Sequence, residues 1–144
     1  MYKSDSPYYK VLELAGATIK RFGEFGSYQG EWWAEVIYKD KRGWVNGFYG
    51  SCTGCDALLA EFGRADHNCN GEEYYDPIYK MNFRENCKTC QNIKKRLIEL
   101  GEKYLENIMS KADAITLARK NSDWDVEADK MVDFIKNKQK GIKK

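Results

Sequence analysis

Apolar positions follow a strand period in the first third of the chain and a helix period in the second half. Between residues 31 and 38, aromatic and β-branched residues alternate, so that Trp32 and Val36 share one face and Trp33 lies on the other. A polar loop at 39–43 and a second apolar run at 44–49 follow, which is typical of a β-hairpin. Because both faces carry apolar side chains, we expect the sheet to be covered on both sides or used for binding on one.

The remaining pattern predicts helices. A first helix is expected at 7–15, because Ser6 can cap it, Pro7 suits its first position and Gly16 can end it. Residues 17–28 predict a strand and a turn, and 64–81 a long loop. Further helices are expected at 57–63, 84–109, 111–120 and 123–138. The last two follow Ser110-x-x-Asp113 and Ser122-x-x-Asp125, which resemble capping boxes.

Strands that precede helices, rather than alternating with them, favour an α+β fold. We therefore predict a small antiparallel sheet with a Trp-rich hairpin, followed by a mainly helical C-terminal half. The 144 residues suit a single domain. Within it we expect a helix, hairpin and short helix over 1–63, a loop over 64–83, helices over 84–138 and a basic tail over 139–144.

The sequence offers no sign of a membrane segment. Its apolar runs are far shorter than the roughly 20 residues that span a bilayer, and the N-terminus lacks the apolar stretch of a secretory signal. We expect a cytosolic protein with no membrane partner.

The cysteines are the first candidate for chemistry. Cys52-x-x-Cys55 and Cys87-x-x-Cys90 have the spacing of paired metal ligands, and four thiolates held this way form a tetrahedral zinc site. His67 and Cys69 lie between the pairs and could replace a member of either. Five cysteines without a secretory signal argue against a full disulfide framework. A structural zinc site, reduced buried thiols, and redox or catalytic use all stay open.

Support for an enzyme is weak. A Cys-x-x-Cys turn after a strand can lower a thiol pKa, which would suit a thiol enzyme working through Cys52 or Cys55. No βαβ pattern surrounds that turn, and the chain has no G-x-S-x-G, Walker-type or H-E-x-x-H motif. We therefore favour a non-enzymatic protein.

Aromatic and acidic residues suggest a contact surface for a partner, because Trp and Tyr are enriched at interface hot spots. The alternative is a well-packed sheet in which these aromatics are core. An acidic surface of this kind could also imitate nucleic acid. The residues that we predict to bind a partner are Trp32, Trp33, Trp44, Tyr49, Glu72, Glu73, Tyr74, Tyr75 and Asp76.

The net charge is only +2, so the field of the whole molecule is weak. Basic residues nevertheless gather locally, which keeps a second hypothesis open: a zinc-stabilised nucleic-acid-binding protein. Its binding would fall steeply with salt. The residues involved would be Lys39, Lys41, Arg42, Lys94, Lys95 and the lysines of the tail.

Two resemblances add to this picture. Residues 33–49, with Gly43-Trp-Val45, look locally like the hairpin of bacterial SH3-like domains. Small proteins of phages and prophages are similar over more of the chain. The similar runs are Gly26-Ser-Tyr-Gln-Gly-Glu-Trp-Trp-Ala34, Gly43-Trp-Val-Asn-Gly-Phe-Tyr-Gly-Ser-Cys-Thr-Gly-Cys-Asp56 and Trp124-Asp-Val-Glu-Ala-Asp-Lys-Met-Val132. This resemblance implies a phage setting and brings no activity with it.

Together these observations lead to one main hypothesis. We expect a non-enzymatic, phage-encoded binding protein that inhibits or redirects a host protein in the host cytosol. An inhibitor of a defence system such as CRISPR–Cas is one form that it could take.

Overall fold

The computed structural model describes residues 6–26, 30–49, 62, 66–120 and 125–136. Three strands form an antiparallel sheet in the order β1-β2-β3, and two short strands form a separate hairpin. The strands are β1 (Thr18–Gly26), β2 (Gly30–Tyr38), β3 (Lys41–Tyr49), β4 (His67–Cys69) and β5 (Glu72–Tyr75). The described helices are α1 (Pro7–Leu14), α3 (Pro77–Lys80), α4 (Lys88–Leu105), α5 (Lys111–Lys120) and α6 (Asp125–Lys136). The predicted α+β class is confirmed.

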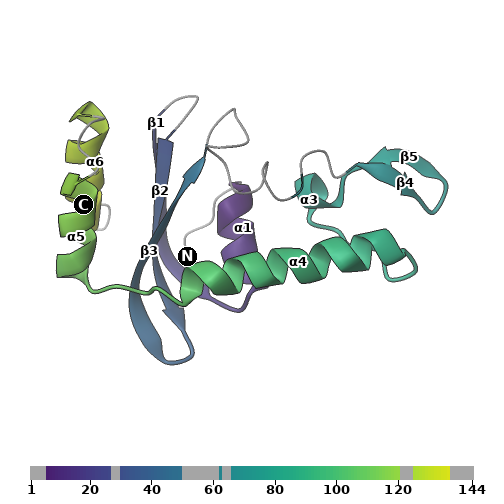
Figure 1. The fold of residues 1–144 in the computed structure, drawn as a ribbon, viewed down its shortest axis with the longest axis horizontal. Coiled ribbons are helices and arrows are strands. Elements are labelled where there is room, and N and C mark those ends of the chain that lie inside the picture. Colours follow the sequence, from purple (N-terminus) through teal and green to yellow (C-terminus); the bar gives the residue numbers. More distant parts are fainter. Residues whose placement is uncertain (1–5, 27–29, 50–61, 63–65, 121–124, 137–144) are drawn as a thin grey trace, which may run out of the picture.

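Helices cover both faces of the β1-β2-β3 sheet (Figure 1). Helices α1 and α4 pack on one face, where Trp32 joins Leu12 and Leu97 in a buried cluster. Helices α5 and α6 cover the other face, where Trp33 and Met131 belong to a second cluster. Of the two alternatives for the sheet, coverage on both sides is confirmed.

The tryptophans are therefore core residues. Trp32 and Trp33 have no exposed surface, and Trp44 is 3% exposed. Trp32 stacks on Tyr8 with ring centroids 5.4 Å apart, and the Trp33 indole N–H donates to the Met131 sulfur at 3.2 Å. The prediction that these three tryptophans form a contact surface is wrong, because the helices on each face bury them.

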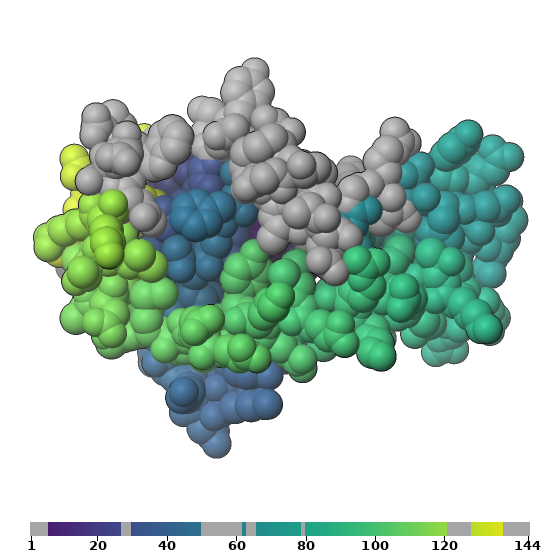
Figure 2. Space-filling model, in the orientation of Figure 1, coloured from purple at the N-terminus to yellow at the C-terminus, as the bar shows by residue number. Residues whose placement is uncertain are grey.

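The turn between β2 and β3 is tighter than expected. Only Lys39 and Asp40 connect the strands, and both have positive φ, 50° and 67°. Two such residues form the turn that matches the twist of a hairpin, so β3 begins at Lys41 and the predicted loop at 39–43 is too long. This end of the hairpin protrudes beyond the helices (Figure 2).

The predicted loop at 64–81 is wrong over most of its length. Residues 67–75 form the β4–β5 hairpin, and α3 follows directly. The turn between β4 and β5 is Asn70-Gly71, with φ of 51° and 85°. Asn-Gly is a strong hairpin signal, and it stands in the sequence between two short runs that can form strands.

The helices agree more closely with the predictions. Ser6 caps α1 by accepting from the Tyr8 backbone N–H at 3.2 Å, and α5 spans the predicted residues with Ser110 at its start. Helix α4 begins after Cys87 and ends at Leu105, so it is shorter than predicted at both ends. The predicted helix at 57–63, apart from Phe62, and the tail at 139–144 lie outside the described residues. No described helix combines the length and apolarity needed to cross a membrane.

A polar cluster ties the sheet to α6. Arg21 on β1 pairs with the buried Glu35 at 3.5 Å and donates to the Phe134 carbonyl at 2.6 Å. Its guanidinium also lies over the rings of Trp44 and Phe134, at 5.0 and 4.6 Å. The carbonyl contact places a cation at the negative end of α6, which is favourable. Burial lowers the pKa of Arg21, and its ion pair with Glu35 opposes that shift.

Gly101 marks a close approach of α4 to the end of α1. A Cβ at this position would lie 2.7 Å from the Ala15 Cβ and 2.8 Å from the Val11 carbonyl oxygen. These distances are far shorter than van der Waals contact, so only glycine allows the two helices to pack this closely.

Gly101→Ala is therefore expected to lower the free energy of unfolding by about 1–3 kcal/mol through overpacking. Helix propensity alone predicts the opposite sign, a gain of up to about 1 kcal/mol. Urea unfolding followed by tryptophan fluorescence measures the change. Glu102→Ala, on the exposed side of the same helix, is the control and should change stability by less than about 0.5 kcal/mol. A stabilising Gly101→Ala would contradict the close packing.

Candidate metal centre

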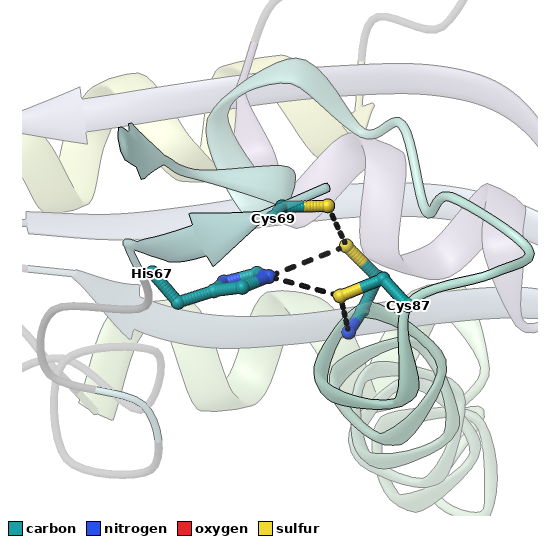
Figure 3. Close-up of side chains that lie close together, drawn as sticks. His67, Cys69 and Cys87 are labelled. Atoms are coloured by element: carbon teal, nitrogen blue, oxygen red, sulfur yellow. Dashed lines mark hydrogen bonds between the residues drawn. The ribbon is translucent and has the colours of Figure 1, made fainter. Parts of the chain in front are cut away.

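One hairpin and one helix end bring four potential metal ligands together. His67 and Cys69 are alternate residues of β4, and Cys87 and Cys90 lie at the start of α4. Cys87 is the N-cap of α4, and Cys90 follows in the first turn, so their side chains share one side of the helix. In Figure 3 the His67 ring and the Cys69 side chain point from the hairpin toward Cys87.

The spacing of the donor atoms is compatible with a tetrahedral zinc site. The His67 Nε2 lies 3.2 Å from the Cys87 sulfur and 3.5 Å from the Cys90 sulfur, and the Cys69 and Cys90 sulfurs are 3.5 Å apart. All four ligand atoms lie within 4.8 Å of one another. With Zn–S about 2.3 Å and Zn–N about 2.0 Å, tetrahedral geometry separates two sulfurs by about 3.8 Å and sulfur from nitrogen by about 3.5 Å. The residues therefore fit zinc.

The centre is largely shielded from water. Cys69 and Cys90 have no exposed surface, Cys87 is 9% exposed, and His67 is half-buried. Tyr75 packs edge-on against the His67 ring. Arg84 donates to the Cys69 carbonyl at 3.1 Å and lies over the Tyr75 ring at 4.0 Å. These contacts fix the orientation of the ligands, as outer residues around metal sites do.

The thiols of the helix end differ in acidity. The backbone N–H of Cys90 donates to the Cys87 sulfur and lowers the pKa of Cys87 to about 6, with His67 contributing in the same direction. Burial instead raises the pKa of Cys90 to about 11. Without a metal, Cys87 is therefore the more acidic of the two helix-end thiols, and a bound cation would favour the thiolate at Cys90 as well.

The observed cluster of four contains two of the predicted main ligands and both of the predicted substitutes. Cys87 and Cys90 were predicted as one ligand pair, and they meet His67 and Cys69, which were named as possible replacements. Cys52 and Cys55 lie outside the described residues, so their role as ligands stays a prediction. The signal for the observed set was the Asn-Gly turn, which identifies His67-x-Cys69 as part of a hairpin.

The predicted acidic–aromatic surface is divided among different roles. Glu72 pairs with Arg84 and Lys80, and the pairing with Arg84 lowers the pKa of Glu72. Tyr75 is buried and donates its hydroxyl hydrogen to the Asn82 carbonyl. The prediction of Tyr75 as a contact residue is therefore wrong.

The other members of that stretch lie nearer the surface. Asp76 accepts from the Ile78 backbone N–H at the start of α3. Glu73 is exposed, and Tyr74 is 76% exposed. Tyr49, from the predicted aromatic face, is half-buried and donates its hydroxyl hydrogen to the Gly26 carbonyl at 3.2 Å. Glu73 and Tyr74 are thus the members that could meet a partner most directly.

The chain matches no protein-family model, no curated protein and no solved structure.

Removing a ligand should release the metal. Cys69→Ser is expected to abolish stoichiometric zinc binding, because it deletes one of four donors, whereas the wild type should hold one zinc ion per chain. Inductively coupled plasma mass spectrometry of the purified proteins measures zinc content. The cobalt-substituted wild type should show thiolate-to-metal absorption. Cys52→Ser is the matched control. Loss of zinc in that control would show that the four clustered side chains do not form the complete ligand set.

The metal-free protein should also show a reactivity difference between the two helix-end thiols. Because the pKa of Cys87 is about 6, iodoacetamide should modify Cys87 first at about pH 7, and the rate should fall as the pH drops through about 6. Cys90, with a pKa of about 11, should react slowly throughout this range. Peptide mapping by mass spectrometry measures both rates. Equal rates for the two cysteines would contradict the assignment.

Proposed function

We propose that this protein is a non-enzymatic binding protein in which a structural zinc ion fastens the β4–β5 hairpin to the start of α4. The observation that carries the proposal is the closed donor set of three thiols and one imidazole. Catalytic zinc sites usually have three protein ligands and keep one position for water or substrate. Four converging protein donors leave no such position, so the metal is assigned a structural role.

The hairpin needs this support because its own hydrophobic cluster is small. The buried cluster consists of Cys69, Tyr75, Cys87 and Cys90, with Phe83 packed against it. Three of its four members are metal ligands, so little apolar surface is left to hold the hairpin. Structural zinc sites supply apparent binding energies on the order of 10 kcal/mol, which would be ample for this purpose.

The β4–β5 hairpin and the start of α4, here called the lobe, present an exposed aromatic residue. The lobe lies at the end of the molecule farthest from α5 and α6 (Figures 1 and 2). Tyr74 extends from it with positive φ, 57°, beside the exposed Glu73. Exposed tyrosine on a rigid support is suited to protein contacts. We propose a protein partner for this surface, and in a phage setting that partner would be a host factor.

Metal removal should loosen the lobe while leaving the main sheet folded. Hydrogen exchange with a chelator present should therefore speed up at residues 67–75 and 87–91, whereas β2, buried between two helical layers, should keep its protection. Mass spectrometry of peptic fragments with and without zinc measures this. If exchange of residues 67–75 is unchanged after the metal is removed, zinc does not fasten the hairpin.

The contact surface has its own test. Tyr74→Ala and Glu73→Gln, in zinc-loaded protein, should reduce capture of a host protein from lysate without changing zinc content. Glu99→Gln, an exposed carboxylate of α4, is the matched control and should capture normally. Quantitative mass spectrometry compares the captured proteins. Equal capture by all variants would contradict the assignment of the hairpin as the contact surface.

A further inference from the structure

Beyond Trp44, the outer edge of β3 has backbone groups that no described strand pairs with. Trp44 directs both of its backbone groups away from β2: its N–H donates to the Met109 carbonyl at 2.8 Å, and its carbonyl accepts from the Met109 N–H at 2.9 Å. In an antiparallel sheet every second residue points the same way, so the backbone groups of Asn46 and Phe48 face this edge too. Within the described ranges, no other strand pairs with them.

A cleft of about 400 Å³ opens beside this stretch of edge. It lies between β3 and the last turns of α4, and its lining residues are Val45, Asn46, Leu100, Lys103, Tyr104 and Asn107. The lining residues combine the largely apolar Leu100 and Tyr104 with the basic Lys103. A side chain that is partly apolar and partly acidic would match both.

A buried hydrogen-bond donor without a partner lies next to the same stretch. Trp32 is fully buried, and its indole Nε1 makes no hydrogen bond. This nitrogen would be 2.7 Å from a Cβ at Gly47, and Tyr104 of the cleft wall contacts the Trp32 ring edge-on at 5.0 Å. An unpaired buried donor costs about 1–3 kcal/mol, so an acceptor brought to this region would be favoured.

Phe48 lies on the face of the sheet opposite the cleft. It pairs in register with Glu31, whereas its neighbour Gly47 pairs with Trp32, so Phe48 lies on the face of the sheet away from the cleft. Its side chain is 52% exposed. A strand added at this edge would place alternate side chains toward the cleft and toward Phe48, as in strand-addition recognition of peptides.

We propose that an extended segment of a partner protein, carrying an acidic side chain, adds as a strand to β3 at Asn46 and Phe48. The Met109 bridge is the reason to expect strand addition, because the chain already pairs a segment of its own at this edge. Lys103 forms no ion pair with an acidic side chain among the described residues and gives the preference for acidic segments. The site lies at the opposite end of α4 from the metal centre, so its tests can fail while the zinc proposal stands, and the reverse.

The direct test uses a synthetic probe, the peptide acetyl-Thr-Val-Glu-Val-Glu-Val-Thr-amide. Titrated into the zinc-loaded ¹⁵N-labelled protein, it should shift the backbone amides of Asn46 and Phe48 and the Trp32 indole N–H in a saturable way. A version N-methylated on its valines cannot add to the edge as an antiparallel strand with its glutamates toward the cleft, and it should bind at least about tenfold more weakly. If the Asn46 and Phe48 amides do not shift, or the N-methylated peptide binds equally well, the proposal is wrong.

Charge reversal separates specific recognition from a general effect on the fold. The wild type should prefer the glutamate peptide over the same peptide with lysines, and Lys103→Glu should invert that preference by about fivefold. An unchanged preference would count against the site. Phe48→Pro removes the outward N–H at an edge position where proline is tolerated, and it should weaken binding while zinc content stays the same.

A second copy of the chain is the rival occupant of this edge. Light scattering coupled to gel filtration should show that the mass in solution is that of a single chain. A dimer that Phe48→Pro dissociates would assign the edge to self-association and overturn the proposal of a partner segment.

Discussion

The alternation of side chains along β2 is the constraint on which the rest of the fold depends. Successive residues of a strand point to opposite faces, so the adjacent Trp32 and Trp33 cannot be buried in one core. Each requires its own covering layer, and the described chain supplies α1 and α4 on one face and α5 and α6 on the other. A strand with two large aromatic rings side by side thus requires three layers. The size of the Trp32 ring also explains why residue 47 is glycine, because a Cβ there would lie 2.6 Å from the ring.

Helix α4 links this sandwich to the metal centre. Its 18 residues span about 27 Å, longer than is needed to cover a three-stranded sheet. Leu97 and Leu105 pack on the sheet, whereas Cys87 and Cys90 lie at its far end, where the hairpin joins it. The lobe therefore has little access to the main core. The proposed metal ligation would hold the hairpin where few apolar contacts do, as in other small structural units.

Polar groups in the sandwich have defined structural uses. Glu35 is buried on the face that carries Trp33, and it is neutralised by Arg21 at 3.5 Å and Arg42 at 3.2 Å. Arg42, one of the residues named for the nucleic-acid hypothesis, pairs with Glu35, and that hypothesis stays a prediction. Phe48 and Tyr74 are the large apolar side chains exposed among the described residues. They lie on different parts of the molecule, beside the β3 edge and on the β4–β5 hairpin, which is why two contact sites are proposed.

Local sequence patterns predicted the α+β class, the hairpin through Trp33, the starts of α1 and α5, and cysteine pairs with metal-ligand spacing. These features follow from local rules of strand alternation, helix capping and short-range spacing. Three-dimensional packing decided the rest. It buried Trp32, Trp33 and Trp44, because a periodic pattern shows which residues share a face and not what covers that face. It also brought His67 and Cys69 to Cys87 and Cys90, because the four residues converge only once the Asn70-Gly71 turn folds β4 and β5 onto the start of α4.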